Sequence, residues 1–331
     1  MKTIRFWTSR DEKDGDYWRD WFCLPAGEYE FVFDKVNPDY LFVSEHIYSR
    51  PSKFREFLRM NTESRLSVYI GGEAISPDLN LFDYACSFDR GLVFADRIIR
   101  KPTTLFFKVH VFESLTEGVD SPRDELRMKK GFCNFIYSNP SAHKRRDELF
   151  DVLSHYKRVD SLGPHLNNCG NVTSRADGDW RRKLIEMKRP YKFSIAAENA
   201  RFDGYVTEKL ISSFQAHTVP IYWGNPSVAE EFNSKAFINA NDLADEELIA
   251  EVRRIDEDDE LWCRMIAEPP MSANQNDAAQ KDAQKFVDFF KSVFDDRPIE
   301  QKKRAPIGYW NDVYRQSLAR VPLDIWRRLR K

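Results

Sequence analysis

Short hydrophobic runs typical of β-strands follow one another through the first third of the chain. They read IRFW, YEFVF, DYLFVSE and LSVYIGG, and the last opens into GGEAISPDLNLFDYACSF. A segment with helical spacing falls between two of these runs, at 51–59. We therefore expect a mostly parallel sheet with helical crossovers. A charge-rich stretch, SPRDELRMKK, precedes a new strand at 131, and we place a domain boundary near residue 125.

The chain after residue 125 alternates strand and helix patterns. The first unit is a strand over 131–138 and a helix with apolar residues at i, i+3, i+4 and i+7, namely Leu149, Val152, Leu153 and Tyr156. The second is a buried strand at 191–197, a loop, a helix that turns Leu210, Ile211 and Phe214 inward, and a strand at 219–223. Such units are parallel and right-handed, and their ligands bind beyond the carboxyl ends of the strands. We therefore look for chemistry in the loop 198–206 and at the helix start that follows it.

Composition narrows the class of protein. The 331 residues suffice for two domains, and 42% hydrophobic with 31% charged residues is typical of a soluble folded chain. A net charge of -2 gives no global attraction to nucleic acid, so we expect no such partner. Five cysteines without a CxxC spacing suggest neither a disulfide framework nor a zinc ribbon. The N-terminus lacks the apolar stretch of a signal peptide and no apolar run reaches 18 residues, so we expect a cytoplasmic location.

Residues 301–331 form a basic, aromatic tail. Nine Lys or Arg stand against two Asp, which leaves about +7 on the tail and about -9 on the body. Among them lie Tyr309, Trp310, Tyr314 and Trp326. Two interpretations stay open. The tail would either pack back on the body, which we favour for residues 301–320, or make a peripheral contact with an anionic membrane such as an inner membrane, which we favour for residues 321–331.

The loop ENARFDGYVTEK joins a buried strand to the next helix. Glu198 and Asn199 come directly after the strand, and Thr207, Glu208 and Lys209 occupy the first turn of the helix. The positive end of the helix dipole together with the charge of Lys209 would suit a phosphate. The alternative is a solvated helix start, with Thr207 as its cap and a Glu–Lys pair on the surface.

Two more candidate positions lie near strand ends. Arg145 and Arg146 precede Leu149 by one turn and extend its inward face, where an arginine could hold a diphosphate bidentately. Their alternative role is to cover apolar surface with their stems at a helix end. The strand LSVYI ends in a Gly-Gly pair followed by Glu73, which is either a general base facing the second domain or an ordinary loop residue.

Other chemical signatures are weak in this sequence. Two DGD triplets, at 14–16 and 177–179, match the DxD pattern of metal sites, but each looks like an exposed turn or a helix start. The six histidines show no HExxH spacing, and the chain has no GxGxxG, GxSxG or P-loop. We therefore assign no metal and expect no cofactor.

With these elements in view, four stretches resemble the C-terminal signature of glycosyltransferase family 10, the α1,3/α1,4-fucosyltransferases: VDSLG, HLNN, YKFSIAAENARFDGYVTEKL and VPIYWGNPSVAEEFNSKAFINANDL. In the first domain, SPDLNLFDYACSFDR and DRIIRKP are similar to the bacterial members. The likeness is very specific across 131–243 and fair across 65–102. It implies an α/β fold of GT-B type, in which two Rossmann-like domains face each other across a cleft. Residues 1–125 would bind the acceptor and residues 126–300 the donor.

The resemblance also implies roles for individual residues. Glu73 matches the family's proposed general base, and Arg146, in preference to Arg145, matches an arginine that holds the donor diphosphate. Lys209 would contact phosphate, while Tyr205 and Glu208 would lie near ribose or fucose. The donor-binding set is thus Arg146, Glu198, Asn199, Tyr205, Glu208 and Lys209.

The activity that the resemblance implies is inverting transfer of L-fucose. The donor would be GDP-β-L-fucose, and the acceptor an oligosaccharide or glycolipid hydroxyl of N-acetyllactosamine type, in α1,3 and α1,4 linkage. No metal is required if side chains neutralise the leaving diphosphate. Two alternatives remain: another GT-B nucleotide-sugar transferase, or a non-catalytic carbohydrate or nucleotide binder with the same fold.

Overall fold

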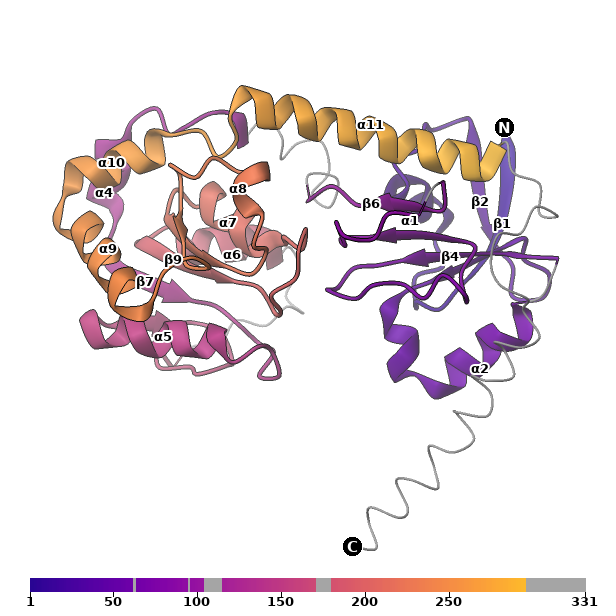
Figure 1. The fold of residues 1–331 in the computed structure, drawn as a ribbon, viewed down its shortest axis with the longest axis horizontal. Helices are drawn as coiled ribbons and strands as arrows, with labels where there is room; N and C mark the ends of the chain where they lie inside the picture. The colour runs from indigo at the N-terminus through magenta and orange to yellow at the C-terminus, as the bar shows by residue number, and fades with distance from the viewer. Residues whose placement is uncertain (62–63, 95, 104–114, 171–179, 296–331) are drawn as a thin grey trace, which may run out of the picture. The chain divides into compact units, whose positions relative to one another are not determined.

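The computed structural model describes residues 1–61, 64–94, 96–103, 115–170 and 180–295. Two compact units make up the chain. Unit 1 contains residues 1–101 and, of the described residues after them, 282–295; unit 2 contains residues 102–281. Each unit is a parallel β-sheet with helices on both faces (Figure 1). The division after residue 101 differs from the boundary expected near residue 125. The tail 301–331 and the DGD triplet at 177–179 lie outside the described residues.

The sheet of unit 1 has six strands, and all its neighbouring strands run parallel. Their order is β2 (Tyr29–Phe33), β1 (Lys2–Thr8), β3 (Tyr40–Val43), β4 (Leu66–Ile70), β5 (Tyr84–Ser87) and β6 (Ile98–Arg100). The hydrophobic runs of the first third of the sequence are therefore strands, as predicted. Three neighbouring strands, β3, β4 and β5, are buried on both faces, which suits the centre of a sheet covered on both sides.

Aromatic residues fill both faces of this sheet. On one face lie η1 (Glu45–Ser49) and α2 (Pro51–Met60), which bury Ile47, Phe54, Phe57 and Leu58. On the other face lie α1 (Gly15–Trp21) and the second half of α11 (Ala273–Asp295). The ring of Phe22 lies 4.5 Å from that of Phe290 and 5.2 Å from that of Phe294. Helix α11 thus begins in unit 2 and completes the core of unit 1, which differs from the expected assignment of residues up to 300 to the second domain.

The sheet of unit 2 has five parallel strands. Their order is β11 (Ile238–Asn239), β10 (Val219–Trp223), β9 (Tyr191–Ala197), β7 (Gly131–Phe135) and β8 (Val159–Ser161). Parallel pairing of β9 with β10 confirms the strand–helix–strand unit predicted over 191–223, and β7 followed by α5 (Arg145–Tyr156) confirms the strand–helix unit predicted before it.

Helices cover both faces of this second sheet. One face carries α5 (Arg145–Tyr156), α9 (Asp245–Glu257) and α10 (Asp259–Ala267), with Leu149 and Leu153 of α5 fully buried. The opposite face carries α6 (Trp180–Lys188), α7 (Glu208–Gln215) and α8 (Val228–Glu231). The charge-rich stretch before β7 forms α4 (Pro122–Met128), which packs on α10.

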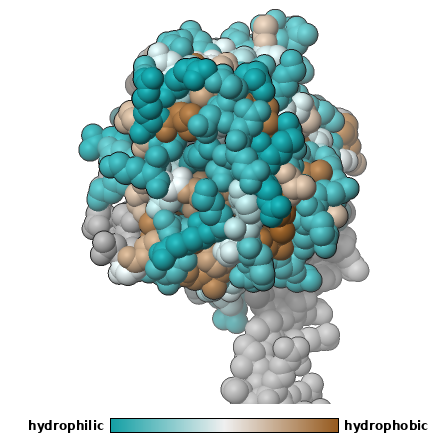
Figure 2. Space-filling model, turned by 90° about the vertical axis from the view of Figure 1, so that its left-hand side faces the viewer, coloured by the Kyte–Doolittle hydropathy of each residue, from teal (hydrophilic) through white to brown (hydrophobic). Residues whose placement is uncertain are grey.

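The surface of unit 2 around α9 and α10 is largely hydrophilic. Hydrophobic residues appear on this face in small separate groups between charged and polar ones (Figure 2). Scattered apolar residues of this kind are normal on a solvated surface. In the part of the chain that the structure describes, no helix has the length and apolarity needed to cross a membrane.

Candidate active site

The residues singled out in unit 2 gather at the carboxyl ends of its central strands. Glu198 directly follows β9, and its N–H donates to the carbonyl of Trp223, the last residue of β10, at 2.8 Å. The next residue, Gly224, packs against the side chain of Glu198. Adjacent parallel strands end at one edge, so loops from both meet there.

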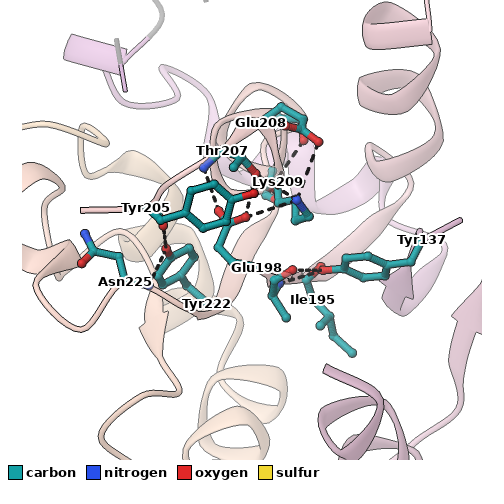
Figure 3. Close-up of polar contacts among 12 residues, drawn as sticks. Tyr137, Ile195, Glu198, Tyr205, Thr207, Glu208, Lys209, Tyr222 and Asn225 are labelled. Atoms are coloured by element: carbon teal, nitrogen blue, oxygen red, sulfur yellow. Dashed lines mark hydrogen bonds and ion pairs between the residues drawn. The ribbon is translucent and has the colours of Figure 1, made fainter. Parts of the chain in front are cut away.

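Glu198 is fully buried, and both of its carboxylate oxygens accept hydrogen bonds (Figure 3). Oε1 accepts from the N–H of Thr207 at 2.7 Å, and Oε2 accepts from the Thr207 hydroxyl at 2.7 Å and from Nζ of Lys209 at 3.2 Å. Burial raises the pKa of the Glu198 carboxyl, and the charge of Lys209 opposes that rise. The carboxylate therefore ties the start of α7 to the end of β9.

Lys209 lies at the start of α7 with 15% of its side chain exposed. Its Nζ donates to the Thr207 hydroxyl at 3.0 Å and lies 3.8 Å from Oε1 of Glu208. Thr207 occupies the N-cap position, but its hydroxyl serves Glu198 rather than a backbone N–H of the helix. The simple surface interpretation, with Thr207 as cap and a solvated Glu–Lys pair, therefore does not describe this turn.

The loop between Asn199 and α7 ends in a turn that is held by several hydrogen bonds. Tyr205 is 1% exposed, and its carbonyl accepts from the hydroxyl of Tyr222 on β10 at 3.3 Å. Oδ1 of Asn225 accepts from the N–H of Gly204 at 2.9 Å, and the N–H of Asn225 donates to the Tyr222 hydroxyl at 3.0 Å. Tyr205 is thus fixed by the loop that follows β10 (Figure 3).

Lys188, the last residue of α6, is buried and donates hydrogen bonds to residues of α7. Its Nζ donates to the carbonyl of Lys209 at 3.1 Å and to the hydroxyls of Ser212 and Ser213 at 2.8 and 2.9 Å. Burial lowers the pKa of the Lys188 ammonium to about 7. The sequence analysis missed this residue, since nothing in WRRKLIEMK distinguishes one of its basic residues from the others.

The structure separates the two neighbouring arginines of α5. Arg145 pairs with Asp245 at 2.6 Å, at the start of α9. Arg146 turns inward and places its guanidinium over the ring of Tyr137, 4.7 Å from the ring centre. The Tyr137 hydroxyl in turn accepts from the N–H of Ala197, at the end of β9, at 2.7 Å. Arg146, and not Arg145, therefore belongs to the strand edge that carries Glu198.

Arg146 is 1% exposed, and a ligand could contact it only if the atoms over it moved aside. Its Nε donates to Asp147 and its Nη2 to the carbonyl of Asn139, while the buried Nη1 has no hydrogen-bond partner among the described residues. The carbonyl of Asn199 accepts from the N–H of His143 at 2.9 Å, which joins the loop after β7 to the loop after β9. An unsatisfied donor on a buried cation is costly unless an anion meets it.

Glu73 belongs to unit 1, where it follows the last residue of β4 after two glycines. The N–H of Gly72 donates to Oε2 of Glu45 at 3.0 Å, and Glu45 itself is 5% exposed. Glu73 is half-buried at the carboxyl end of the strand, as the sequence suggests. Glu45, which holds the turn, is a further residue that the sequence analysis did not single out.

The predicted site residues thus form one group in unit 2, with Glu73 at a strand end of unit 1. Among the described residues there is no group of three or more His, Cys, Asp or Glu placed to hold a metal ion. The chemistry that the unit 2 group offers is anion binding, by Lys209 and a helix N-terminus beside it, with Arg146 on the neighbouring strand–helix unit.

Comparison with known proteins identifies relatives of this chain. Residues 126–267 match the family model "Glycosyltransferase family 10 (fucosyltransferase) C-term". The α-(1,3)-fucosyltransferase FucT of Helicobacter pylori is 31% identical over 293 residues, which are 77% of this chain and 58% of that protein. The GDP-fucose protein O-fucosyltransferase 3 of Homo sapiens is 30% identical over 196 residues, 56% of this chain and 39% of that protein. The chain therefore spans about half the length of these curated relatives.

Among solved structures, α1,3-fucosyltransferases have a fold similar to that of this chain. A crystal structure of an α1,3-fucosyltransferase superposes with a TM-score of 0.70 at 25% identity, covering 90% of this chain and 92% of that one. The same type of enzyme with GDP-fucose gives a TM-score of 0.67, covering 88% and 90%. The fold of the chain is of GT-B type, as predicted, with two units built on parallel sheets.

Proposed function

Because this chain is a member of glycosyltransferase family 10 through its residues 126–267, we propose that it transfers L-fucose from GDP-β-L-fucose to an acceptor hydroxyl. The acceptor would be of N-acetyllactosamine type, on an oligosaccharide or a glycolipid, with α1,3 linkage and also α1,4 linkage. The observation that carries the proposal is the start of α7, where a fully buried Glu198 holds Lys209 at a helix N-terminus beside the end of β9. The relative solved with GDP-fucose supports the choice of donor.

In the proposed reaction, the acceptor oxygen forms a bond to C1 of fucose while the bond from C1 to the diphosphate oxygen breaks. The electron pair of that bond leaves with GDP, and the acceptor proton passes to the carboxylate of Glu73. Attack from the face opposite GDP inverts the configuration at C1. Positioned cations stabilise the charge that develops on the leaving group, which is the role proposed for Lys209 and Arg146.

The remaining residues of the group have supporting roles in this proposal. Tyr205 and Glu208 would contact the ribose or the fucose, and Asn199 would line the same loop. Glu198 is fully buried with both oxygens bonded, so its contribution is to hold Lys209 in place. No metal ion takes part in this scheme, because the side chains and the α7 N-terminus neutralise the diphosphate.

A transfer assay tests the proposal directly. GDP-fucose is offered with lactose, N-acetyllactosamine and its β1,3 isomer, with EDTA in a parallel series. We expect fucosylated product in both series. Transfer from a different sugar nucleotide would point to another GT-B transferase, and GDP binding without any transfer would point to a non-catalytic binder. Loss of activity in EDTA with rescue by Mn²⁺ would overturn metal independence.

The donor site has its own test in binding. Lys209→Gln removes the charge but keeps an amide that can donate to Glu198, so the variant should fold. We expect GDP affinity, measured by calorimetry, to fall by about 10- to 100-fold, since a charge-assisted contact is worth roughly 1.5–3 kcal/mol. Lys235→Met, at an exposed loop position of the same unit, is the matched control and should bind GDP like the wild type.

A further inference from the structure

The side chains of Asp147 and His165 connect Arg146 to the loop after β8 in unit 2. Nε2 of His165 lies 2.9 Å from Oδ2 of Asp147, and Oδ1 of Asp147 accepts from Nε of Arg146 at 3.2 Å. One carboxylate therefore bridges an imidazole and the guanidinium. The two ends of this chain of contacts are 19 residues apart in sequence, on α5 and after β8.

His165 is itself firmly placed. Its N–H donates to the carbonyl of Tyr137 at 3.0 Å, and its carbonyl accepts from the Ser161 hydroxyl at 2.8 Å. The imidazole ring lies 6.1 Å from the ring of Phe135, and 13% of the side chain is exposed. The backbone of His165 is thus held by the residues at and after the ends of β8 and β7, and its ring lies near Phe135 of β7.

Arg146 has a fixed direction as a result of these contacts. Asp147 holds Nε, the carbonyl of Asn139 accepts from Nη2 at 2.6 Å, and the ring of Tyr137 lies against the guanidinium face. Within the part of the chain that the structure describes, Nη1 has no hydrogen-bond partner. A guanidinium is planar and presents its donors in a rigid fork, so fixing Nε and Nη2 also fixes the direction of Nη1.

We propose that His165 is a positioning residue that acts through Asp147 to direct Nη1 of Arg146 toward the donor diphosphate. The inference rests on the proposed function, since it assumes that Arg146 meets a diphosphate. His165 does not contact the donor in this scheme. Without its hydrogen bond, Asp147 can rotate, and the guanidinium loses the orientation in which an anion completes its hydrogen bonding.

The test measures GDP affinity by calorimetry for His165 variants, both in the otherwise wild-type chain and in the Arg146→Ala variant. His165→Phe keeps a ring against Phe135 but cannot hydrogen-bond to Asp147, and His165→Gln restores an N–H donor at a similar position. We expect His165→Phe to weaken GDP binding by about 3- to 10-fold and His165→Gln to recover most of the loss. In the Arg146→Ala background, His165→Phe should change GDP affinity by less than about 2-fold, because the residue through which it acts is absent.

His155→Phe is the matched control. His155 lies in the last turn of α5, the helix that also carries Arg146, and its Nδ1 is 2.7 Å from the carbonyl of Asp151. This variant should leave GDP affinity unchanged. If His165→Phe does not fold, His165→Leu serves in the same comparison.

Several results would overturn the inference. Wild-type GDP affinity in His165→Phe would do so, as would an equal loss in both backgrounds, which indicates a general structural role. If Arg146→Ala binds GDP normally while fucosyl transfer persists, the inference fails and the proposed function stands. If the wild-type chain binds neither GDP nor GDP-fucose, the proposed function fails and the inference fails with it.

Discussion

Glu198 illustrates how a buried charge can hold a neighbouring cation in place, here at the proposed donor site. A carboxylate with no exposed surface is costly unless it is paired and hydrogen-bonded, and here three donors from two residues satisfy it. The same contacts place the ammonium of Lys209 at the start of α7. The sequence interpretation counted Glu198 among the donor-binding residues, whereas its contacts suit an anchor for that set.

Glu73 is the residue proposed to take the proton of the acceptor hydroxyl. Glu73→Gln keeps the size of the side chain and removes its ability to accept a proton, so we expect kcat for fucosyl transfer to fall by roughly 10²–10⁴-fold. GDP affinity should stay the same, because Glu73 belongs to unit 1 and the residues proposed to bind the donor belong to unit 2. Steady-state kinetics and calorimetry measure the two effects separately.

A matched variant in unit 1 makes this prediction specific. Asp89→Asn removes a carboxylate from the loop after the neighbouring strand β5, where Oδ1 accepts from the N–H of Gly91 at 2.9 Å. It should leave kcat within a few fold of the wild type. Activity of Glu73→Gln within the same range would exclude Glu73 as the base.

Single residues were predictable where the chemistry lies in one contiguous stretch. Glu198 directly follows a clear strand and Lys209 lies at the start of the next helix, so their positions marked them as candidates, whereas Tyr205 was named only from the family resemblance. His165 and Lys188 were not predictable in this way. Each acts on a residue about 20 positions away, and only the packing of helices on the sheet brings the partners together.

At the scale of elements, the site depends on how closely β9, β10 and α7 approach one another. Gly224 has a φ of +151°, and a Cβ atom there would lie 2.5 Å from Cγ of Glu198. The absence of a side chain at this position is what allows Glu198 to lie between β10 and α7.

Gly224→Ala should therefore disturb the donor site through Glu198. The new methyl group pushes the carboxylate away from Thr207 and Lys209, so we expect GDP affinity to fall by about 10-fold and the free energy of unfolding by about 1–3 kcal/mol. Gly27→Ala in unit 1 is the control, because Gly27 also has a positive φ, of +88°, but a Cβ atom there would meet no atom of the described residues within 4 Å. A similar loss of GDP affinity in both variants would argue against the clash with Glu198.

Lys188 gives a prediction about pH at the junction of α6 and α7. Burial lowers its pKa from the ordinary 10.5 to about 7, so between these values the unfolded chain binds more protons than the folded one. The stability contributed at this site therefore rises with pH over that range, by at most about 1.4 kcal/mol per pH unit. In denaturant unfolding, the free energy of unfolding of the wild type should increase relative to that of Lys188→Met as pH rises from 7 toward 10. Parallel stability curves would mean that the ammonium titrates normally.

Element prediction from the sequence succeeded for most of both sheets. The run YKFSIAA coincides with β9, and VPIYW coincides with β10, because each is a short apolar run bounded by polar turns. The role of α11 could not be read in this way. The spacing of Phe286, Phe290 and Phe294 predicts an apolar helix face, but not that the face belongs to unit 1.

The molecule consists of two units, each built on a parallel sheet, and the chain passes from unit 1 into unit 2 and back into unit 1 at residue 282. This return explains why a boundary drawn from local composition differs from the division by contacts: the last described helix contributes to both units. Charge is also unevenly distributed at this scale, since residues 301–331 carry about +7 and the rest of the chain about -9. A basic segment that follows an acidic body can bind that body or an anionic surface.

Binding to phospholipid vesicles distinguishes a tail that packs on the body from one that contacts a membrane. Residues 321–331 contain Trp326 and four basic residues at the very end, and each basic residue near an anionic membrane contributes about 1 kcal/mol. We expect the full chain to co-sediment with vesicles of anionic phospholipid at low salt, and to be released at high salt as screening increases. Truncation after Val321 should abolish binding and keep fucosyl transfer. Replacing Arg327, Arg328 and Arg330 with Gln keeps the length and the tryptophan, so it should weaken binding in proportion to charge. Equal sedimentation of the truncated and full chains would exclude membrane contact through this segment.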